Sequence, residues 1–327
     1  MFDMQSHRVL VTGATGFIGR HVVEQLLHTG KAVRILTRGS RIIPESWSGR
    51  VEITAGELNH PASLKRAVLG CQIVFHLAAE LRNPAKMASV NAEGTRLLLK
   101  VCSEAGVHAL VQLSSVGVMG ASRPGDVDEY EPCRPLNPYE KSKYAAEKLV
   151  QAWSKHPGNR VVIIRPTNVF GDGPRGGQDS MLSWLRAVQK RKFVFFDRHA
   201  VSNYVYVKDV AEACCLAASS TRSGIFIVND PCKLVDFVSA AAEVLGVPVP
   251  RFRIPLPIAI ASALAFQGAA YLMRRRSPLT ISRVRALSVR TRYLPDRIKT
   301  AVGWHPAVGY RLGLQHTVNW YRQTKQI

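Results

Sequence analysis

The chain has 327 residues, of which 46% are hydrophobic and 20% are charged, so it can bury a large core and lacks the composition of a disordered protein. Its formal net charge is +21, and the stretch from Arg251 to the C-terminus holds fourteen Lys or Arg residues but a single acid, Asp296. A basic field of this kind attracts nucleic acid, anionic lipid or an acidic ligand, although a solvated basic surface gives the same count.

The cysteines predict a reducing compartment. There are six, at positions 71, 102, 133, 214, 215 and 232, and they are spaced neither as CxxC pairs nor as a regular disulfide framework. The first strand-like run begins at Arg8, and no apolar stretch followed by a cleavage site precedes it. We therefore expect reduced thiols and a cytoplasmic location.

Strand-like and helix-like segments alternate along the first half of the chain. The strand-like runs are apolar, and each helical segment ends at a glycine or a Pro/Gly pair. The predicted strands are Arg8–Thr12, Ala32–Leu36, Val51–Thr54, Ile73–Leu77, Ala109–Leu113 and Arg160–Arg165. The predicted helices are Phe17–His28, Pro61–Leu69, Ala88–Ala105 and Tyr139–Trp153. This alternation predicts an α/β fold with a doubly wound parallel sheet of the Rossmann type.

A glycine-rich loop follows the first predicted strand and opens the first predicted helix. Residues 12–19 read Thr-Gly-Ala-Thr-Gly-Phe-Ile-Gly, which differs slightly from the usual GxGxxG spacing. Gly13 permits a tight turn, Gly16 lets the backbone approach a pyrophosphate, and Gly19 allows the helix to pack closely on the strand. The loop therefore predicts a dinucleotide site lined by Gly13, Thr15, Gly16, Phe17, Ile18 and Gly19.

The residues after the second and third predicted strands are expected to contact the adenosine half of the dinucleotide. The tripeptide that ends at Arg38 offers no carboxylate to the ribose hydroxyls, whereas Arg38 can hold a 2′-phosphate. We therefore expect NADP, with NAD as the alternative, because Arg38 could equally be a surface arginine that stacks on adenine. Glu57 and Leu58, after the third strand, are expected at the adenine edge.

A Tyr and a Lys four residues apart share one face of a helix, where the ammonium group can stabilise a phenolate. The chain has four such pairs: Tyr139/Lys143, Tyr144/Lys148, Tyr204/Lys208 and Tyr321/Lys325. The third begins in a strand-like stretch, the fourth lies near the C-terminus, and Tyr144 is turned by about 140° from Tyr139 on the same helix. Only Tyr139/Lys143 has a proline opening its helix and a hydroxyl pair, Ser114-Ser115, at the end of the preceding strand.

The regular alternation ends shortly after Pro166. A glycine-rich loop at residues 171–177 follows, and later elements are shorter, including Tyr204–Val207 and Gly224–Asn229. We predict a dinucleotide-binding domain over residues 1–175 and a smaller substrate-binding lobe over residues 176–327, with residues 203–230 returning to the first domain. Because ligands of doubly wound sheets bind beyond the carboxyl ends of the strands, this lobe would close over that edge.

Motifs along most of the chain resemble those of the extended short-chain dehydrogenase/reductases, which include NAD-dependent epimerases and dehydratases. They are TGATGFIG at 12–19, HLAA at 76–79, Asn91 with Gly94-Thr95, Ser114-Ser115 before Val118-Met119-Gly120, Tyr139 to Lys143, and RPTNVFG at 165–171. The resemblance implies that Tyr139 is the general acid/base, that Lys143 binds the nicotinamide ribose and lowers the tyrosine pKa, and that Ser115 hydrogen-bonds the reacting oxygen. It also implies a homodimer formed through the Tyr139 helix, and cofactor contacts by Leu77, Ala78, Ala79, Asn91, Ser114, Tyr139, Lys143, Pro166 and Asn168.

Two departures from the sugar-nucleotide members of this family bear on the substrate. Those members usually place a diphosphate-binding arginine just before an aromatic-V-x-V-x-D-V stretch; the stretch is present at 204–210, but Ser202 and Asn203 replace the arginine and the next acid. An Arg-x-Gly-Asp element before Gly303-Trp304 is also missing. The C-terminal part is more similar to the 3β-hydroxysteroid dehydrogenase branch, in residues 277–280, 292–293 and 303–304.

This second resemblance predicts an oxidoreductase that interconverts an alcohol and a ketone on a hydrophobic, sterol-like or isoprenoid-like small molecule. A nucleotide-sugar epimerase or dehydratase with a tightly bound NAD(P) is the alternative. A non-catalytic NADP-binding or nucleic-acid-binding protein is a lesser one; the chain has no zinc-finger spacing, RNP-like motif or evident helix-turn-helix, so no nucleic-acid partner is expected. No histidine cluster suggests a metal site, and His76 is expected to pack rather than to react.

One apolar stretch interrupts the basic C-terminal region. Ile254–Met273 contains no charged residue and is followed by three arginines at 274–276. Its length is close to that of a bilayer span, but Pro255 and Pro257 interrupt its start. A buried helix of the lobe, a peripheral contact with an anionic membrane and a full span are the three interpretations.

Overall fold

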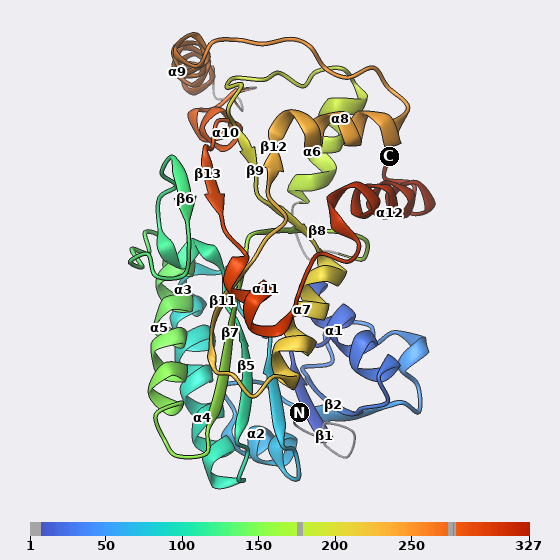
Figure 1. Cartoon of the computed structure of the whole chain (residues 1–327), viewed down its shortest axis with the longest axis vertical. Helices are drawn as coiled ribbons and strands as arrows, with labels where there is room; N and C mark the ends of the chain where they lie inside the picture. Colours follow the sequence, from blue (N-terminus) through green and yellow to red (C-terminus); the bar gives the residue numbers. More distant parts are fainter. Residues whose placement is uncertain (1–7, 175–178, 274–276, 278) are drawn as a thin grey trace.

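A seven-stranded parallel sheet forms the centre of the molecule (Figure 1). The computed structural model describes residues 8–174, 179–273, 277 and 279–327. The strand order is β11-β7-β5-β4-β1-β2-β3, so the winding reverses between β1 and β4, as the predicted doubly wound fold requires; that prediction is confirmed. The strands are β1 (Arg8–Thr12), β2 (Ala32–Thr37), β3 (Val51–Ala55), β4 (Ile73–His76), β5 (Ala109–Leu113), β7 (Arg160–Pro166) and β11 (Gly224–Val228).

Helices cover both faces of this sheet. On one face α1 (Phe17–His28), α7 (Val207–Ser219) and α11 (Asp296–Val302) pack on a cluster that includes Val9 and Val11 of β1. On the other face α2 (Pro61–Val68), α4 (Gly94–Glu104) and α5 (Pro138–Trp153) pack on a cluster that includes Leu10. Successive side chains of a strand point to opposite faces, so the unbroken apolar run of β1 serves both layers at once.

The predicted helices agree with the observed ones except near residue 88. The segment expected as one helix over 88–105 begins as a π-helical turn, Ala88–Glu93, between the short α3 (Pro84–Met87) and α4. Asn91 lies in this turn, and its side-chain amide exchanges two hydrogen bonds with the backbone of Glu80. We attribute the widened turn to these bonds, since π-helical turns inside α-helices commonly serve a local contact.

The C-terminal half adds a lobe beyond the carboxyl ends of the strands (Figure 1). Its core is formed by α6 (Ser180–Gln189), α8 (Leu234–Leu245) and α12 (Gly309–Gln323) around Phe170 and Phe237. β11 lies in the central sheet, whereas β10 stays with the lobe. The short strand pairs are β8 (Asn168–Phe170) with β10 (Tyr204–Tyr206), β9 (Val201–Ser202) with β12 (Cys232–Lys233), and β6 (Gly125–Val127) with β13 (Thr291–Tyr293), and the short 3-10 helices are Glu45–Trp47 and Val116–Met119.

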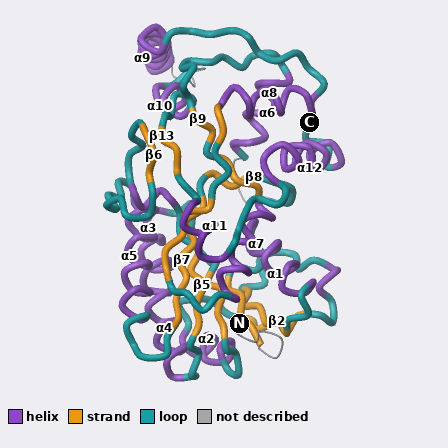
Figure 2. The backbone as a smooth tube through the Cα atoms, in the orientation of Figure 1, coloured by secondary structure: helices purple, strands orange, loops and turns teal. Residues whose placement is uncertain are grey.

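The apolar stretch at 254–273 forms α9 (Leu256–Leu272), which lies at the far end of the lobe beside the short α10 (Ile281–Ala286) (Figure 1). Figure 2 shows the long loop that leads from α8 to α9. Within the described ranges no helix is long and apolar enough to cross a bilayer. The arginines at 274–276 and residues 175–177 of the glycine-rich loop lie outside the described residues.

Candidate functional site

A cavity of about 370 Å³ opens at the carboxyl ends of the central strands. It contains residues from the ends of β1 and β4, between which the strand order reverses, and this is where doubly wound sheets bind ligands. Most of the predicted site residues line it: Gly13, Thr15, Gly16, Phe17, Ile18, Gly19, Arg38, Glu57, Leu58, Leu77, Ala78, Ala79, Ser114, Ser115, Tyr139, Lys143 and Pro166. The fold therefore brings the glycine loop and the Tyr/Lys pair into one cavity.

Backbone contacts make glycine necessary in the loop after β1. Gly13 has a φ of +72°, and a Cβ at this position would lie 2.6 Å from the backbone nitrogen of Ala78. A Cβ on Gly19 would collide with the carbonyl oxygen of Gly13. Gly16 is the N-cap of α1, where no side chain caps the helix and the first turn holds no acid. The uncapped N–H groups and the positive end of the helix dipole suit a pyrophosphate, so the loop fits a dinucleotide.

Charged side chains surround the part of the cavity beyond β2. Arg38 and Arg41 both line it, and Arg41 donates a hydrogen bond of 3.1 Å to the carbonyl oxygen of Thr15. Glu57 and Glu80 line the same cavity; backbone hydrogen bonds lower the pKa of Glu80, and Arg38 adds to this effect. Arg41 was not predicted from the sequence. The prediction considered only the residues directly after the second strand, and Arg41 lies three residues beyond Arg38.

The start of α5 holds Tyr139 in the cavity. Asn137 and Glu140 form a capping box, in which each side chain accepts a hydrogen bond from the other residue's backbone nitrogen, and this fixes the first turn of the helix. The Ser115 hydroxyl accepts a hydrogen bond of 3.1 Å from the backbone of Gly117. Burial raises the pKa of Tyr139 to about 12, although the Ser115 hydroxyl lowers it. The phenol is therefore protonated at neutral pH.

Lys143 lies one turn further along α5 and is buried. Its ammonium group donates a hydrogen bond of 2.5 Å to the carbonyl oxygen of Leu113, at the end of β5. Burial lowers the pKa of Lys143 to about 8, while Glu147 on the next turn raises it. Glu147 is held in turn by a buried ion pair of 2.6 Å with Arg165. Lys143 is not among the groups that shift the pKa of Tyr139 here, so the acidification of the phenol by Lys143 stays a prediction.

The other three Tyr/Lys pairs do not line this cavity. The ammonium group of Lys148 lies over the ring of Tyr144, 4.5 Å from the ring centroid. Tyr204 is stacked in the core of the lobe, and Tyr321 is fully buried with its hydroxyl bonded to a carboxylate. The selection of Tyr139 and Lys143 by helix context therefore agrees with their placement.

Two predicted cofactor residues lie outside the cavity wall. Asn91 is buried, and its amide holds the backbone of Glu80, which does line the cavity. Asn168 has an exposed side chain in β8, whereas its neighbours Thr167 and Val169 line the cavity. Direct contacts of Asn91 and Asn168 with a cofactor stay predictions.

The residues at the positions that depart from the sugar-nucleotide pattern are buried or are engaged within the protein. Ser202 and Asn203 are both buried, and the Asn203 amide forms hydrogen bonds of 2.8 and 2.9 Å with other buried groups of the lobe. Arg290 and Arg292, just before the final helices, are each paired with a carboxylate at 2.6 Å. These two arginines are thus already engaged within the protein.

Comparisons with known proteins agree with this geometry. The family described as "NAD dependent epimerase/dehydratase family" matches residues 9–228. The chain is 29% identical to 3beta-hydroxysteroid-dehydrogenase/decarboxylase isoform 2 of Arabidopsis thaliana, over 95% of this chain but only 61% of the Arabidopsis protein. It is 27% identical to the decarboxylating sterol-4-alpha-carboxylate 3-dehydrogenase of Candida albicans, over 96% of this chain and 97% of that protein.

A solved structure is similar over both the sheet and the lobe. It is the UDP-glucose 4-epimerase of Thermus thermophilus in complex with NAD, which superposes with a TM-score of 0.71 at 27% identity. The alignment covers 96% of this chain and 99% of the epimerase. The similarity therefore extends well beyond the glycine loop.

Proposed function

This chain belongs to the NAD dependent epimerase/dehydratase family, and we propose that within it the protein interconverts an alcohol and a ketone on a hydrophobic, sterol-like or isoprenoid-like substrate. Relatives in the family are NAD-dependent dehydrogenases and epimerases, so the protein is an NAD(P)-dependent enzyme of this family. One observation carries the proposal: Ser115, Tyr139 and Lys143 line the same cavity as the glycine loop. A hydride acceptor and a proton-transfer group would then act on one bound alcohol.

The cofactor, when bound, supplies the acceptor or donor of the hydride. Tyr139 takes the proton of the substrate hydroxyl as the hydride leaves the carbinol carbon, and in the reverse direction it gives a proton to the carbonyl oxygen. Ser115 hydrogen-bonds the same oxygen and keeps it beside the phenol. Lys143 binds the ribose next to the nicotinamide and stabilises the phenolate form of Tyr139. Because oxidation needs the phenolate, whose pKa burial raises to about 12, we expect the oxidation rate to increase with pH.

Two arginines support NADP as the cofactor. Arg38 and Arg41 line the cavity beyond β2, where the 2′-phosphate of the adenosine ribose would lie. Glu57 and Glu80 line the same cavity, and a carboxylate there can bind the 2′-hydroxyl of NAD. NAD is therefore kept as the alternative cofactor.

Two kinds of observation support a hydrophobic substrate. The chain has a buried serine, Ser202, where sugar-nucleotide enzymes carry an arginine, and Arg290 and Arg292 are engaged in ion pairs that a diphosphate would have to displace. Both relatives described above carry names that refer to sterol-type substrates, one a hydroxysteroid dehydrogenase/decarboxylase and the other a sterol-carboxylate dehydrogenase. The similar UDP-glucose 4-epimerase keeps epimerisation of a nucleotide sugar as the second candidate.

The test compares three forms of the protein, each assayed with 3β-hydroxysteroids, prenylated alcohols and UDP-hexoses in the presence of NAD or NADP. We expect the wild type to reduce the cofactor with an apolar alcohol. Tyr139→Phe should lower turnover by a factor of about 10² or more, because general acid/base catalysis contributes at least that much. Tyr144→Phe, which changes a tyrosine of the same helix outside the cavity, should keep wild-type turnover.

Cofactor binding is followed separately, by the rise in melting temperature that NAD or NADP causes. It should persist in Tyr139→Phe, which would place the defect in chemistry rather than in folding. Near-normal turnover in Tyr139→Phe would refute the catalytic role. Interconversion of UDP-hexoses without oxidation of any apolar alcohol would replace the proposed reaction by epimerisation.

A further inference from the structure

We propose that α9 docks the protein on an anionic membrane by inserting its large apolar side chains into one leaflet. The helix, Leu256–Leu272, contains no charged residue, and its apolar residues are spread around the whole circumference. A surface helix of a water-soluble protein normally carries a polar face toward the solvent. A helix that is apolar all round is expected in a protein core or in lipid, and only part of the α9 surface is covered by the lobe.

The side chains that α9 buries are the small ones. Ala259, Ala263 and Ala270 are buried, and the first two share a cluster with α10. Several large side chains of the helix are exposed: Leu264 is 56% exposed and Tyr271 is 84% exposed. Further exposed apolar side chains on or next to the helix are Phe252, Ile258, Phe266 and Met273. This arrangement is the reverse of a water-facing helix, and a contiguous exposed apolar surface of this kind marks a binding surface.

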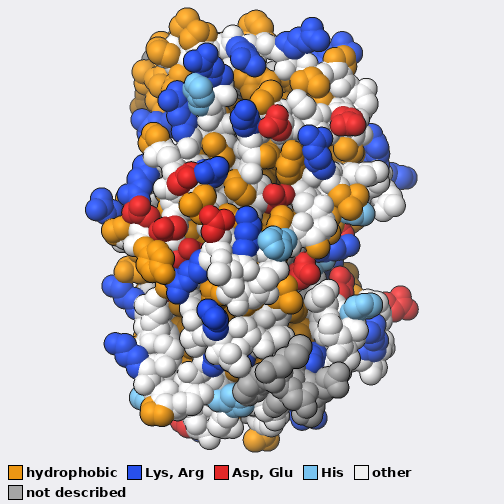
Figure 3. Space-filling view, viewed as in Figure 1, with side chains coloured by type: hydrophobic (Ala, Val, Ile, Leu, Met, Phe, Trp, Pro, Cys, Tyr) orange, Lys and Arg blue, Asp and Glu red, His pale blue; other side chains and the backbone are white. Residues whose placement is uncertain are grey.

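The positive charge around α9 favours anionic lipid as the partner of its exposed apolar surface. Residues 244–295 contain nine arginines and no Asp or Glu, and Arg251, Arg253 and Arg285 are exposed on the segments that flank or contact α9. Figure 3 shows hydrophobic side chains gathered at the upper end of the molecule, with Lys and Arg side chains beside them. The carboxylate of Asp197, close to this region, is engaged by Arg290. Anionic headgroups complement such a rim, whereas a second copy of the chain would bring the same positive charge against it.

The position of the helix in the fold favours insertion into a single leaflet. Seventeen residues of α-helix extend about 26 Å, which is shorter than the roughly 30 Å hydrocarbon core of a bilayer. α10 follows after a short connection and packs back on α9 and on Phe196 of the lobe, so both ends of α9 return to the same side. The proposal rests on α9 and its arginines alone and does not depend on the proposed function.

Flotation with liposomes tests the proposal. The wild type should float with vesicles that contain phosphatidylserine and should not float with pure phosphatidylcholine vesicles. Leu264→Asp/Tyr271→Asp places two charges on the exposed apolar surface and should abolish flotation. Arg251→Gln/Arg285→Gln should weaken partitioning about thirtyfold, since each basic residue near an anionic surface contributes on the order of 1 kcal/mol.

Two matched controls separate docking from general effects of mutation. Leu312→Asp changes an exposed apolar residue of α12, and Lys86→Gln/Lys100→Gln removes two exposed positive charges of the nucleotide-binding half; both should float like the wild type. Cofactor-induced thermal stabilisation confirms that every variant is folded. Equal flotation with neutral and anionic vesicles, or unchanged flotation of the α9 variant, would overturn the proposal. So would a lipid-free dimer that Leu264→Asp/Tyr271→Asp converts to a monomer, because α9 would then be covered by a second copy.

Discussion

At the scale of single residues, burial determines how the titratable groups near the cavity behave. His76 ends β4 and is buried between two hydroxyls, with Nδ1 2.7 Å from Thr12 Oγ1 and Nε2 2.9 Å from Thr95 Oγ1. Burial, and secondarily the charge of Lys143, lowers the pKa of His76 to about 3. The imidazole is therefore neutral at working pH and links β1, β4 and α4. This agrees with the expectation that His76 packs rather than reacts.

The neutral imidazole makes stability depend on pH. In the unfolded chain His76 takes up a proton near pH 6.5, but in the folded protein it does so only near pH 3, so stability is lost as the pH falls between these values. We expect the free energy of unfolding of the wild type to fall more steeply than that of His76→Gln, by up to about 1.4 kcal/mol per pH unit. Urea titrations between pH 6 and pH 4 measure the two slopes. His156→Gln, at an exposed histidine, should keep the wild-type slope, and parallel slopes for His76→Gln would contradict the assignment.

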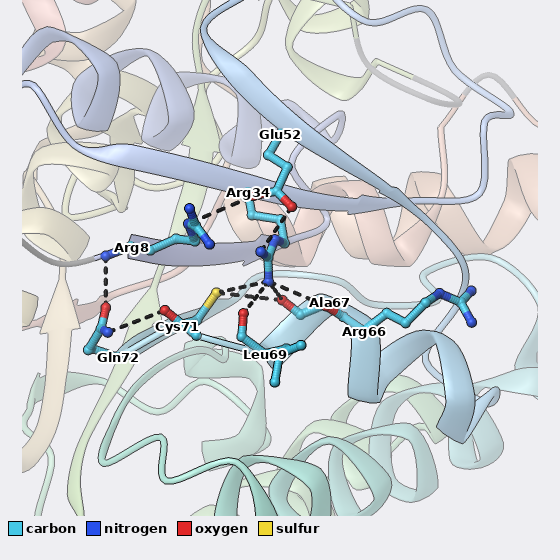
Figure 4. Close-up of polar contacts among 9 residues, drawn as sticks. Arg8, Arg34, Glu52, Arg66, Ala67, Leu69, Cys71 and Gln72 are labelled. Atoms are coloured by element: carbon cyan, nitrogen blue, oxygen red, sulfur yellow. Dashed lines mark hydrogen bonds and ion pairs between the residues drawn. The ribbon is translucent and has the colours of Figure 1, made fainter.

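At the scale of elements, one buried arginine closes the end of a helix. Arg34 of β2 is 5% exposed, and its guanidinium group donates to the carbonyl oxygens of Ala67 at 2.9 Å and Leu69 at 2.6 Å, where α2 ends. Figure 4 shows Arg34 between this helix end and Glu52 of β3, whose carboxylate lies 2.9 Å away. A cation at the C-terminus of a helix satisfies its free carbonyls and its dipole, so Arg34 joins β2, β3 and α2.

Removing this guanidinium group should cost more than removing its carboxylate partner. Arg34→Met leaves the carbonyls at the end of α2, of which that of Ala67 is buried, without this donor and should lower the free energy of unfolding by about 2 to 3 kcal/mol. Glu52→Gln should cost less than about 1 kcal/mol, because Glu52 is half exposed and its ion pair is screened by solvent. Denaturant titrations of the two variants measure the difference. Equal losses would mean that the ion pair, and not the helix end, is what Arg34 stabilises.

At the scale of the whole molecule, the cavity collects residues from most of the first half of the chain. The glycine loop, the end of β2, the end of β4 and the start of α5 all contribute to it. A ligand that binds there contacts all of these segments at once. Its binding free energy therefore appears as stability of the whole fold, and this provides a measure of cofactor choice that does not require the substrate.

We expect NADP to raise the melting temperature more than NAD at equal concentration. A ligand present at 100 times its dissociation constant stabilises a protein by about 2.7 kcal/mol, which corresponds to several degrees for a chain of this size. Arg38→Ala/Arg41→Ala should remove the preference and keep the response to NAD. Arg50→Ala changes an exposed arginine outside the cavity and should leave both responses intact. A larger response to NAD in the wild type would show that the carboxylates of Glu57 and Glu80 decide the choice instead.

The fold and the Tyr139/Lys143 part of the candidate site could be predicted from the sequence, because their signals are local. Apolar runs and helix stops operate within a few residues, and the glycine loop works through steric contacts of its own backbone with the neighbouring strand ends. The position of Tyr139 follows from a helix start that Pro138 and the cap Asn137 specify within one turn. These features can therefore be predicted from the sequence without knowledge of any tertiary contact.

Only the tertiary structure decided which distant side chains meet. Arg41 bonds to Thr15, and Arg34 bonds to the end of α2. Arg290 pairs with the carboxylate of Asp197, about ninety residues earlier in the chain. No sequence pattern predicts these contacts. The apolar composition of α9 was visible in the sequence, but not that Ala259, Ala263 and Ala270 are buried while Leu264 and Tyr271 are exposed. The physical reason is the same in each case: periodicity and sterics determine local conformation, whereas pairing and exposure depend on where the folded chain places surfaces that are far apart in sequence.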